Sequence, residues 1–327
     1  MQIDVVGGGS LGLLFGGRLA EAGADVTIWT RSREQAELLR LQGIRLLHLD
    51  GSEGNVPVRS CALEEASVHR SSTGSNQLTS IRSIWLTVKQ TDLSDVLLDQ
   101  LEALTAGRQE NPAVMVCLQN GIGHLERIQN RFPDLTLLAA VTTEGARRLD
   151  ARSVQHTGQG QLYLGRWHEN ICEHDEFLEI SQKMLVSQLQ LAGFTSFLSN
   201  HMDNRIFQKL LINAIINPLT ALFDVVNGEL PEHPSRLRLM RELYAETEII
   251  LQKAGMVLSE DGWKLVTEVC KQTSGNVSSM LSDVRLGRRT EIDAINGGIV
   301  SLAEKHQLPA PLNRAIIALI HALYSNP

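Results

Sequence analysis

The chain has 327 residues, of which 43% are hydrophobic and 20% are charged, and its formal net charge at pH 7 is −7. This length is enough for one large or two ordinary domains, each with its own hydrophobic core. The acidic balance argues against nucleic acid as a partner, because binding to phosphate backbones depends on an excess of basic residues.

We expect neither a membrane segment nor a metal site. No uninterrupted apolar stretch reaches the ~18 residues that span a bilayer, and Asp4 interrupts the first apolar run, so no signal peptide is predicted. The cysteines form no closely spaced pair, which favours free thiols in a reducing cytoplasm over disulfides or zinc. They are Cys61, Cys117, Cys172 and Cys270.

Short apolar strands alternate with helical patterns through the first half of the chain. A glycine-bounded helix pattern at 10–23 follows the first strand, and residues 43–60 are typical of a short antiparallel excursion. This alternation predicts βαβ units and a mostly parallel sheet. The predicted strands lie at 2–7, 25–30, 84–88, 113–118 and 135–141. The polar stretch 67–80 is predicted to be a surface loop.

The pattern changes after about residue 200, where almost every segment is typical of a helix. The predicted helices lie at 202–227, 234–254, 259–272, 290–306 and 312–325. The sequence therefore predicts an α/β dinucleotide-binding domain at 1–197 and an all-helical domain at 198–327, with a ligand cleft between them.

The first strand and helix enclose a glycine-rich loop. Gly7, Gly9 and Gly12 match G-x-G-x-x-G, in which the glycines allow a tight turn, a close pyrophosphate and close helix packing. The pyrophosphate would lie on backbone N–H groups at the helix N-terminus, where the helix dipole favours an anion. The predicted cofactor-binding loop comprises Gly7, Gly8, Gly9, Ser10, Leu11 and Gly12.

The second strand ends in "IWTRSR", where an NAD site would place an acid to hold the ribose hydroxyls. Thr30 and Arg31 occupy that place here. An arginine binds a 2′-phosphate through two hydrogen bonds, whereas a carboxylate repels it. We therefore predict NADP(H) with Arg31 as the phosphate-binding residue; the alternative is a solvated loop arginine.

Two further motifs follow predicted strands. "TVKQTD" places Lys89, and "QNGIG" places Asn120, at the carboxyl edge of the sheet, where open α/β folds bind ligands. Asn120 is suited to a ribose or a nicotinamide amide. A strand-end lysine or an Asn-Gly turn is as often purely structural.

The segment 206–230 places polar side chains in an apolar helix. Lys209, Asn213 and Asn217 are spaced i, i+4, i+8 and share one helix face. Because their neighbours are apolar, these polar groups need partners or a wet cavity; the alternative is a polar face that meets solvent. Pro218 is expected to kink or loosen the helix.

In the segment 276–300, Ser278 and Ser279 precede a short apolar turn, and "RTEIDAING" begins a helix. Thr290 is a possible N-cap, with Glu291 and Asp293 in the first turn. Capping and complementation of the helix dipole would explain these acids without any catalytic role.

Over nearly its whole length the sequence resembles the ketopantoate reductase family. The resemblance rests on the glycine loop and on "TVKQTD", "QNGIG", "TTEGARR", "KLLINAIINPLTAL", "NGEL", "SSML" and "RRTEIDAING". It implies a Rossmann-type domain joined to a helical domain, similar to the 6-phosphogluconate dehydrogenase group. It also implies NADPH-dependent reduction of 2-dehydropantoate to (R)-pantoate in pantothenate and coenzyme A biosynthesis.

The resemblance implies roles for particular residues. Lys209 would be the general acid, and Glu291 would position it and contact substrate or cofactor. Lys89 and Asn120 would lie near the ribose and nicotinamide, and Arg31 would bind the 2′-phosphate. The implied substrate-binding residues are Asn213, Asn217, Asn227 and Ser279.

Two alternatives remain at this point. One is a related NADP-dependent reductase that acts on a different 2-keto acid, and the other is a non-catalytic NADP-binding protein. A homodimer through the helical domain is also compatible with its apolar helices.

Overall fold

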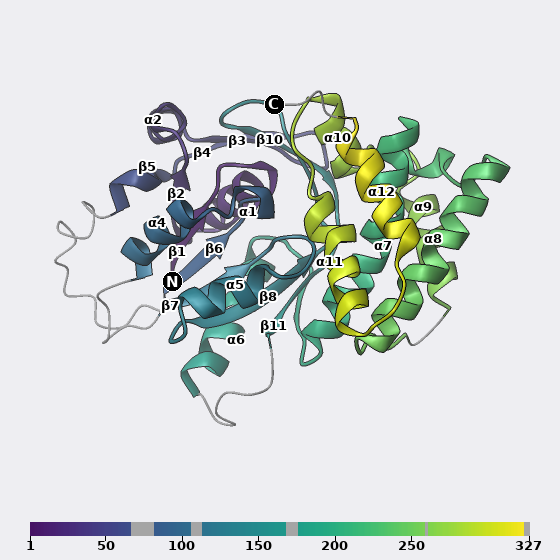
Figure 1. The fold of residues 1–327 in the computed structure, drawn as a ribbon. Helices are drawn as coiled ribbons and strands as arrows, with labels where there is room; N and C mark the ends of the chain where they lie inside the picture. The colour runs from purple at the N-terminus through teal and green to yellow at the C-terminus, as the bar shows by residue number, and fades with distance from the viewer. Residues whose placement is uncertain (67–81, 106–112, 168–175, 259–260, 324–327) are drawn as a thin grey trace. The chain divides into compact units, whose positions relative to one another are not determined.

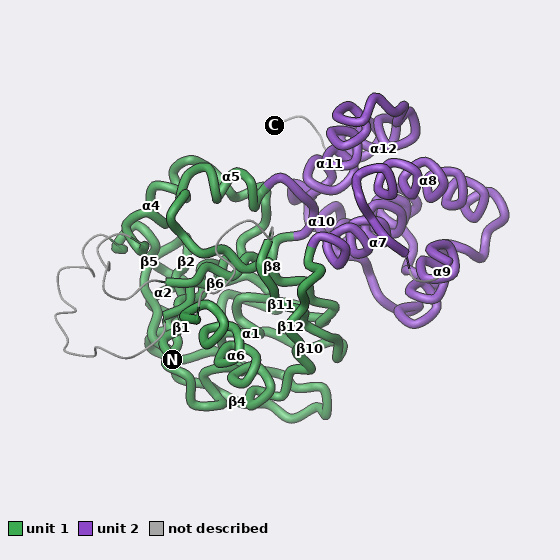
Figure 2. Tube along the Cα trace, turned by 90° about the horizontal axis from the view of Figure 1, so that it is seen from below, with its two compact units in different colours: residues 1–119, 124–202 green, residues 120–123, 203–327 purple. Residues whose placement is uncertain are grey.

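The structure is a computed structural model that describes residues 1–66, 82–105, 113–167, 176–258 and 261–323 (Figure 1). The chain divides into two compact units, coloured separately in Figure 2. Unit 1 comprises Met1–Gln119 and His124–Met202, and unit 2 comprises Asn120–Gly123 and Asp203–Pro327. The division thus falls after Met202, where the sequence suggested residue 197, and the short loop 120–123 belongs to unit 2. The predicted loop at 67–80 and Cys172 lie outside the described residues.

An eight-stranded sheet forms the centre of unit 1, in the order β12-β11-β8-β7-β6-β1-β2-β5. The strands from β5 to β8 in this order are parallel, whereas β11 is antiparallel to β8. The chain runs outward on both sides of β1, so this is a doubly wound sheet with its switch point at β1. The strands are β1 (Gln2–Val6), β2 (Asp25–Thr30), β5 (Arg59–Ala62), β6 (Arg82–Leu86), β7 (Ala113–Cys117), β8 (Thr136–Thr142), β11 (Leu162–Arg166) and β12 (Ser196–Leu198).

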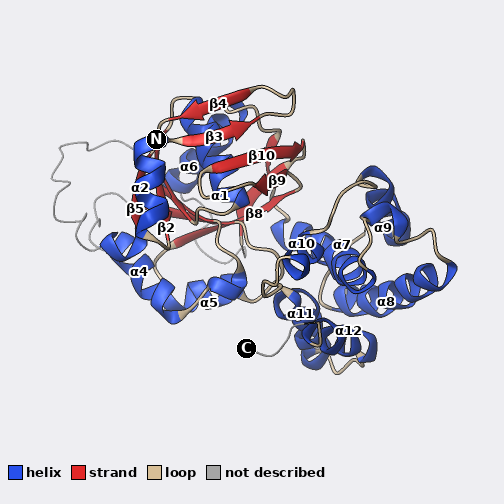
Figure 3. Cartoon of the chain, turned by 90° about the horizontal axis from the view of Figure 1, so that it is seen from above, coloured by secondary structure: helices blue, strands red, loops and turns tan. Residues whose placement is uncertain are grey.

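Helices cover both faces of this sheet. In Figures 2 and 3, α1 and α6 lie on one face, and α4 and α5 lie on the other. The helices of unit 1 are α1 (Ser10–Glu21), α2 (Arg33–Gln42), α4 (Asp95–Thr105), α5 (His124–Arg131) and α6 (Glu176–Leu191). Two single 3₁₀ turns are η1 (Leu63–Glu65) and η2 (Gln90–Asp92).

A second sheet of four strands, in the order β4-β3-β10-β9, packs over α1 (Figure 3). Its strands are β3 (Ile44–Leu47), β4 (Glu53–Val56), β9 (Gly145–Arg148) and β10 (Ser153–Gly158). The antiparallel β3–β4 pair confirms the excursion predicted at 43–60, although the end of that segment joins the main sheet as β5.

A buried ion pair fixes the central strands of unit 1. The carboxylate of Asp4 on β1 lies 2.6 Å from Nε of Arg82 on β6, and both side chains are buried. Asp4 also accepts a hydrogen bond from the indole N–H of Trp29 on β2 (2.7 Å). Because both partners satisfy the carboxylate, the charge is tolerated in the core and holds three adjacent strands in register.

Unit 2 is helical around its own hydrophobic core. Its helices are α7 (Met202–Phe223), α8 (Pro234–Lys253), α9 (Gly262–Gln272), α10 (Ser279–Arg285), α11 (Ile292–Lys305) and α12 (Pro311–His321), with the 3₁₀ turn η3 (Asn227–Glu229). The structure therefore confirms the α/β class, with a Rossmann-type domain followed by a helical domain. A short helix, α10, forms where only an apolar turn was expected.

Helix α7 is long and apolar enough to cross a membrane when judged by length and composition alone. In this protein 56% of the relevant window is buried. Leu210, Leu211 and Ile215 of α7 lie in the core of unit 2. The core helix of a soluble protein passes the same test, so this finding is weak support for a membrane span.

Candidate functional site

The glycine loop joins β1 to α1 in a form that only glycine permits at two positions. Gly7 has φ +116°, in the left-handed region, and its N–H donates to the carbonyl of Trp29 (2.8 Å). A Cβ on Gly12 would lie 1.9 Å from the carbonyl oxygen of Gly7. The absence of both side chains therefore lets α1 begin directly against the turn.

The N-terminus of α1 has no side chain that caps it or neutralises the positive end of the helix dipole. Gly9 is the N-cap residue, so no side chain caps the helix, and the first turn of α1 contains no acid. A Cβ added to Gly9 would meet no protein atom within 4 Å. No side chain therefore competes with an anion, such as a phosphate group, for the N–H groups at this end of the helix.

Two side chains hold this loop from the second sheet and from α2. Gln35 donates to the carbonyl oxygens of Gly8 (2.9 Å) and Ala151 (2.7 Å). Arg148 of β9 donates to the carbonyl of Gly8 (3.1 Å), and its backbone N–H donates to Oγ of Ser10 (3.1 Å). Sequence reasoning missed Arg148, although the segment "TTEGARR" contains it. It places a positive charge beside the glycine loop.

The end of β2 carries no carboxylate. Thr30 is buried, and its hydroxyl donates to a backbone carbonyl two residues further on (2.7 Å). Arg31 is 92% exposed, and its guanidinium lies 3.6 Å from Asp92, a loose surface pair. Arg33 is instead hydrogen-bonded to Glu64. Of the two arginines, Arg31 is thus the more accessible to a phosphate.

The ends of β6 and β7 lie at the same edge of the sheet as the glycine loop, because these strands are parallel to β1. Thr87 follows β6 and donates to the carbonyl oxygens of Val6 (2.9 Å) and Gly7 (3.0 Å), and Lys89 comes two residues later. Gln119 follows β7, and neither amide atom of its buried side chain has a partner among the residues described. Such a buried amide is suited to bind a polar ligand.

In unit 2, Lys209 lies on the partly buried face of α7. Burial lowers the pKa of Lys209 to about 8, and the nearby carboxylate of Glu291 opposes that shift by raising it. No residue within the described ranges accepts a hydrogen bond from Nζ of Lys209. Asn213, half-buried, and Asn217, buried, follow on the same helix face, as the spacing predicted.

Glu291 occupies the N-cap position of α11 but does not cap it. Its buried carboxylate instead accepts a hydrogen bond from the side-chain amide of Asn120 (3.0 Å). The predicted N-cap, Thr290, is wrong: it lies outside the helix, and its hydroxyl has no partner in the described part of the chain. Asp293 does lie in the first turn, where it pairs with His321 (3.1 Å).

The loop 120–123, which belongs to unit 2, is fixed onto α11. The N–H of Ile122 donates to the carbonyl of Ala294 (3.2 Å), and a Cβ on Gly121 would lie 2.3 Å from that same oxygen. Gly121 also has φ +81°. A side chain at this position would therefore push the loop away from α11 and take Asn120 away from Glu291.

Asn227 and Ser279 lie on η3 and at the start of α10. Asn227 is buried, and its side-chain NH₂ donates to the hydroxyl of Thr273 (2.9 Å), whereas its side-chain oxygen Oδ1 has no partner in the described ranges. Ser279 is exposed. The preceding residue, Ser278, caps α10 and accepts a hydrogen bond from Thr220 of α7 (2.8 Å), which ties the start of α10 to α7.

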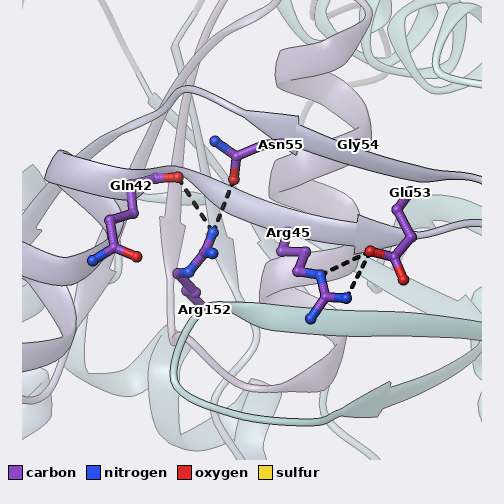
Figure 4. A pocket seen from close by; sticks show the side chains of 6 residues that line it. All are labelled: Gln42, Arg45, Glu53, Gly54, Asn55 and Arg152. Atoms are coloured by element: carbon purple, nitrogen blue, oxygen red, sulfur yellow. Dashed lines mark hydrogen bonds and ion pairs between the residues drawn. The ribbon is translucent and has the colours of Figure 1, made fainter.

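A separate hollow of about 550 Å³ lies on the second sheet (Figure 4). Arg45 and Glu53 form an ion pair in it, and Arg152 donates to the side chain of Asn55 (2.8 Å). Its lining residues are Gln42, Arg45, Glu53, Gly54, Asn55 and Arg152. The predicted site residues are not among them.

The described residues contain no group of three or more His, Cys, Asp or Glu side chains that could hold a metal ion. Three cysteines in the described ranges, Cys61, Cys117 and Cys270, carry free thiols. Burial raises the pKa of Cys117 to about 12 and that of Cys270 to about 11, so both thiols stay protonated at neutral pH.

Comparison with known proteins matches both parts of the chain. Residues 3–169 match the family "Ketopantoate reductase PanE/ApbA", and residues 201–324 match "Ketopantoate reductase PanE/ApbA C terminal". The 2-dehydropantoate 2-reductase of Bacillus subtilis is 31% identical over 100% of this chain and 98% of that protein. The 2-dehydropantoate 2-reductase of Archaeoglobus fulgidus is 30% identical over 99% of this chain and 98% of that protein.

Solved structures share the fold. The crystal structure of a probable 2-dehydropantoate 2-reductase from Bacillus subtilis has a TM-score of 0.75 at 30% identity, covering 99% of this chain and 100% of that one. The ternary structure of D-mandelate dehydrogenase with NADH and anilino(oxo)acetate has a TM-score of 0.80 at 22% identity, covering 99% of this chain and 98% of that one. The second likeness concerns the fold alone.

We predict that Gly9→Ala separates ligand binding from stability. The added methyl group would meet no protein atom within 4 Å, so the free energy of unfolding should change by less than about 1 kcal/mol. The same methyl fills the space before the helix N-terminus, so dinucleotide affinity, measured by titration of nucleotide fluorescence, should fall about tenfold or more. Gly12→Ala is the matched control, and it should lower stability by about 1–3 kcal/mol. Unchanged affinity in Gly9→Ala would contradict a phosphate site here.

Proposed function

The chain belongs to the ketopantoate reductase family, and from this membership and the site we propose that it reduces 2-dehydropantoate to (R)-pantoate with NADPH. The observation that carries the proposal is a lysine, Lys209, whose pKa burial lowers and the carboxylate of Glu291 raises, followed by two asparagines on the same face of α7. A ketone reduction needs such an acid, because negative charge develops on the carbonyl oxygen.

When bound, the nicotinamide supplies the hydride that the carbonyl carbon accepts. Lys209 is the general acid: its ammonium group stabilises the developing oxyanion and then gives it a proton. Burial alone would favour the neutral amine, and Glu291 counteracts this by favouring the charged form. Asn120 orients the Glu291 carboxylate through its 3.0 Å hydrogen bond. Lys209 thus stays protonated at neutral pH but close to its pKa, which suits proton transfer.

The substrate groups are assigned to the amides and the hydroxyl around α7. Asn213 and Asn217 follow Lys209 at successive turns, so a small acid bound along this face would contact all three. Asn227 contributes a buried side-chain oxygen, Oδ1, that lacks a partner in the described ranges and is suited to accept a hydrogen bond from a substrate hydroxyl. Ser279 completes the proposed set at the start of α10.

Unit 1 supplies residues that fit NADPH. The uncapped N-terminus of α1 and the space at Gly9 suit the pyrophosphate, and Arg148 adds a positive charge there. Arg31 is proposed to bind the 2′-phosphate at the end of β2, where the strand itself ends without an acid and Arg31 forms only a loose surface pair with Asp92. Lys89 and Gln119 are proposed to contact the ribose and nicotinamide end.

A second candidate is a reductase for another 2-keto acid. The likeness to D-mandelate dehydrogenase, which was solved with NADH and anilino(oxo)acetate, shows this fold beside a different acid and a different nucleotide. A non-catalytic NADP-binding protein would need the glycine loop but not the Lys209–Glu291–Asn120 arrangement. The cytoplasmic location and the homodimer stay predictions from sequence.

We predict that Lys209→Ala lowers kcat by roughly 10²–10⁴-fold with 2-dehydropantoate and leaves NADPH affinity intact. The assay follows NADPH oxidation and includes a panel of other 2-keto acids. Wild-type protein should prefer 2-dehydropantoate. Near-normal turnover by the variant would remove Lys209 as the acid, and a preference for another acid would favour the second candidate.

For the cofactor, we predict that Arg31→Ala weakens NADPH binding by about tenfold to a hundredfold, because a hydrogen-bonded charge pair is lost. NADH has no 2′-phosphate, so its affinity should change little. Arg33→Ala is the matched control, since Arg33 is already bonded to Glu64. Equal weakening for both nucleotides would contradict the assignment of Arg31.

A further inference from the structure

Helix α7 continues to Phe223 although Pro218 lies inside it. Proline has no N–H, so the carbonyl of Ala214, four residues earlier, loses its usual helical partner. Sequence reasoning expected a kink or a loosened helix there. The carbonyl lies in the buried core, since Ala214 is 0% exposed, so leaving it unpaired would cost stability.

Asn296 of α11 supplies the missing donor. Its side-chain amide donates to the carbonyl oxygen of Ala214 at 3.0 Å and to the side-chain oxygen of Asn313 at 2.9 Å. Because both neighbours are acceptors, the NH₂ group must face them, which fixes the amide orientation. The oxygen of Asn296 has no partner within the described ranges, so this arrangement carries a cost that the two bonds must offset.

A further pair of residues holds Asn313 in turn. Its amide donates to the carboxylate of Glu246 on α8 (2.9 Å) and to the hydroxyl of Thr247 (3.1 Å). Glu246 also accepts the backbone N–H groups of Leu312 (3.0 Å) and Asn313 (2.8 Å) at the start of α12. The bonds thus run from a carboxylate on α8 through α12 and α11 to the backbone of α7.

The Asn296–Ala214 contact lies little more than one turn beyond the proposed catalytic group on each of the two helices. Ala214 directly follows Asn213 on α7, and Lys209 is little more than one turn earlier. Asn296 is little more than one turn after Glu291 on α11. A shift of α11 along α7 would therefore break this bond and change the separation of Glu291 from Lys209.

We propose that Asn296 positions Glu291 relative to Lys209. It does this by donating a hydrogen bond to the carbonyl of Ala214, which Pro218 leaves without a helical partner. The role in catalysis rests on the proposed function. The bond itself does not, so each can be tested separately. Pro218 makes the Ala214 carbonyl available, and Asn296 uses it to set the register of α11 on α7.

The test is a double-mutant cycle of Asn296→Leu with Pro218→Ala. Alanine at position 218 restores an N–H that can bond to the Ala214 carbonyl. We expect Asn296→Leu to lower the urea midpoint in the wild-type background, and to lower it clearly less when Pro218→Ala is present. Rescue should be partial, because Asn313 still loses a donor. Pro234→Ala is the matched control: Pro234 begins α8, where a helix N–H has no partner to restore.

The functional readout is kcat/KM and its pH dependence. Misplacement of Glu291 should lower kcat/KM of Asn296→Leu by up to about 10²-fold. It should also move the loss of activity at high pH to a lower pH, because the carboxylate of Glu291 raises the pKa of Lys209. Pro218→Ala should reverse part of both effects. If Asn296→Leu lowers the urea midpoint equally with and without Pro218→Ala, Asn296 does not compensate for the N–H that Pro218 lacks. An unmoved pH profile would overturn the positioning role, whereas full activity of Lys209→Ala would instead overturn the proposed function.

Discussion

In the proposed mechanism, the effect of the Glu291 carboxylate on the partly buried amine of Lys209 is the constraint on which the site depends. Burial favours the neutral amine, which donates a proton poorly, and the nearby carboxylate restores the charged form. The two groups come from α7 and from the start of α11, so their pairing requires these helices to keep one register. Glu291 occupies the N-cap position of α11 without capping it, and its carboxylate is bonded to Asn120 instead.

Several unusual features of unit 2 serve that register. Gly121 lets the loop 120–123 lie on α11, which brings Asn120 within 3.0 Å of Glu291. Because Pro218 has no N–H, the carbonyl of Ala214 accepts a hydrogen bond from Asn296 of α11 and not from its own helix. This bond joins α7 to α11. In unit 1 the corresponding constraint is steric: glycines bring α1 against β1, and the second sheet packs over α1 and places Arg148 beside the loop.

Features with a local cause could be predicted from sequence. The glycine loop, the parallel strands up to β8, and the shared face of Lys209 and Asn213 follow from spacing and hydrophobic period alone, whereas the strands β9 to β12 were not predicted. The direction of the Glu291 side chain could not be predicted, because capping and catalysis place an acid at the same helix position. Arg148 and Asn296 were missed for a related reason. Each acts through a contact with a residue distant in sequence, and no periodicity marks such contacts.

The most direct test of the central claim is the pH dependence of kcat/KM for 2-dehydropantoate reduction, in the wild-type protein and in Glu291→Gln. Activity should fall above pH about 8, as Lys209 loses its proton, and removal of the carboxylate should move this fall to lower pH. Asp293→Asn, which removes a carboxylate in the first turn of the same helix, should leave the profile in place. If the profile of Glu291→Gln coincides with that of the wild type, Glu291 does not hold the proton on Lys209 and the account fails.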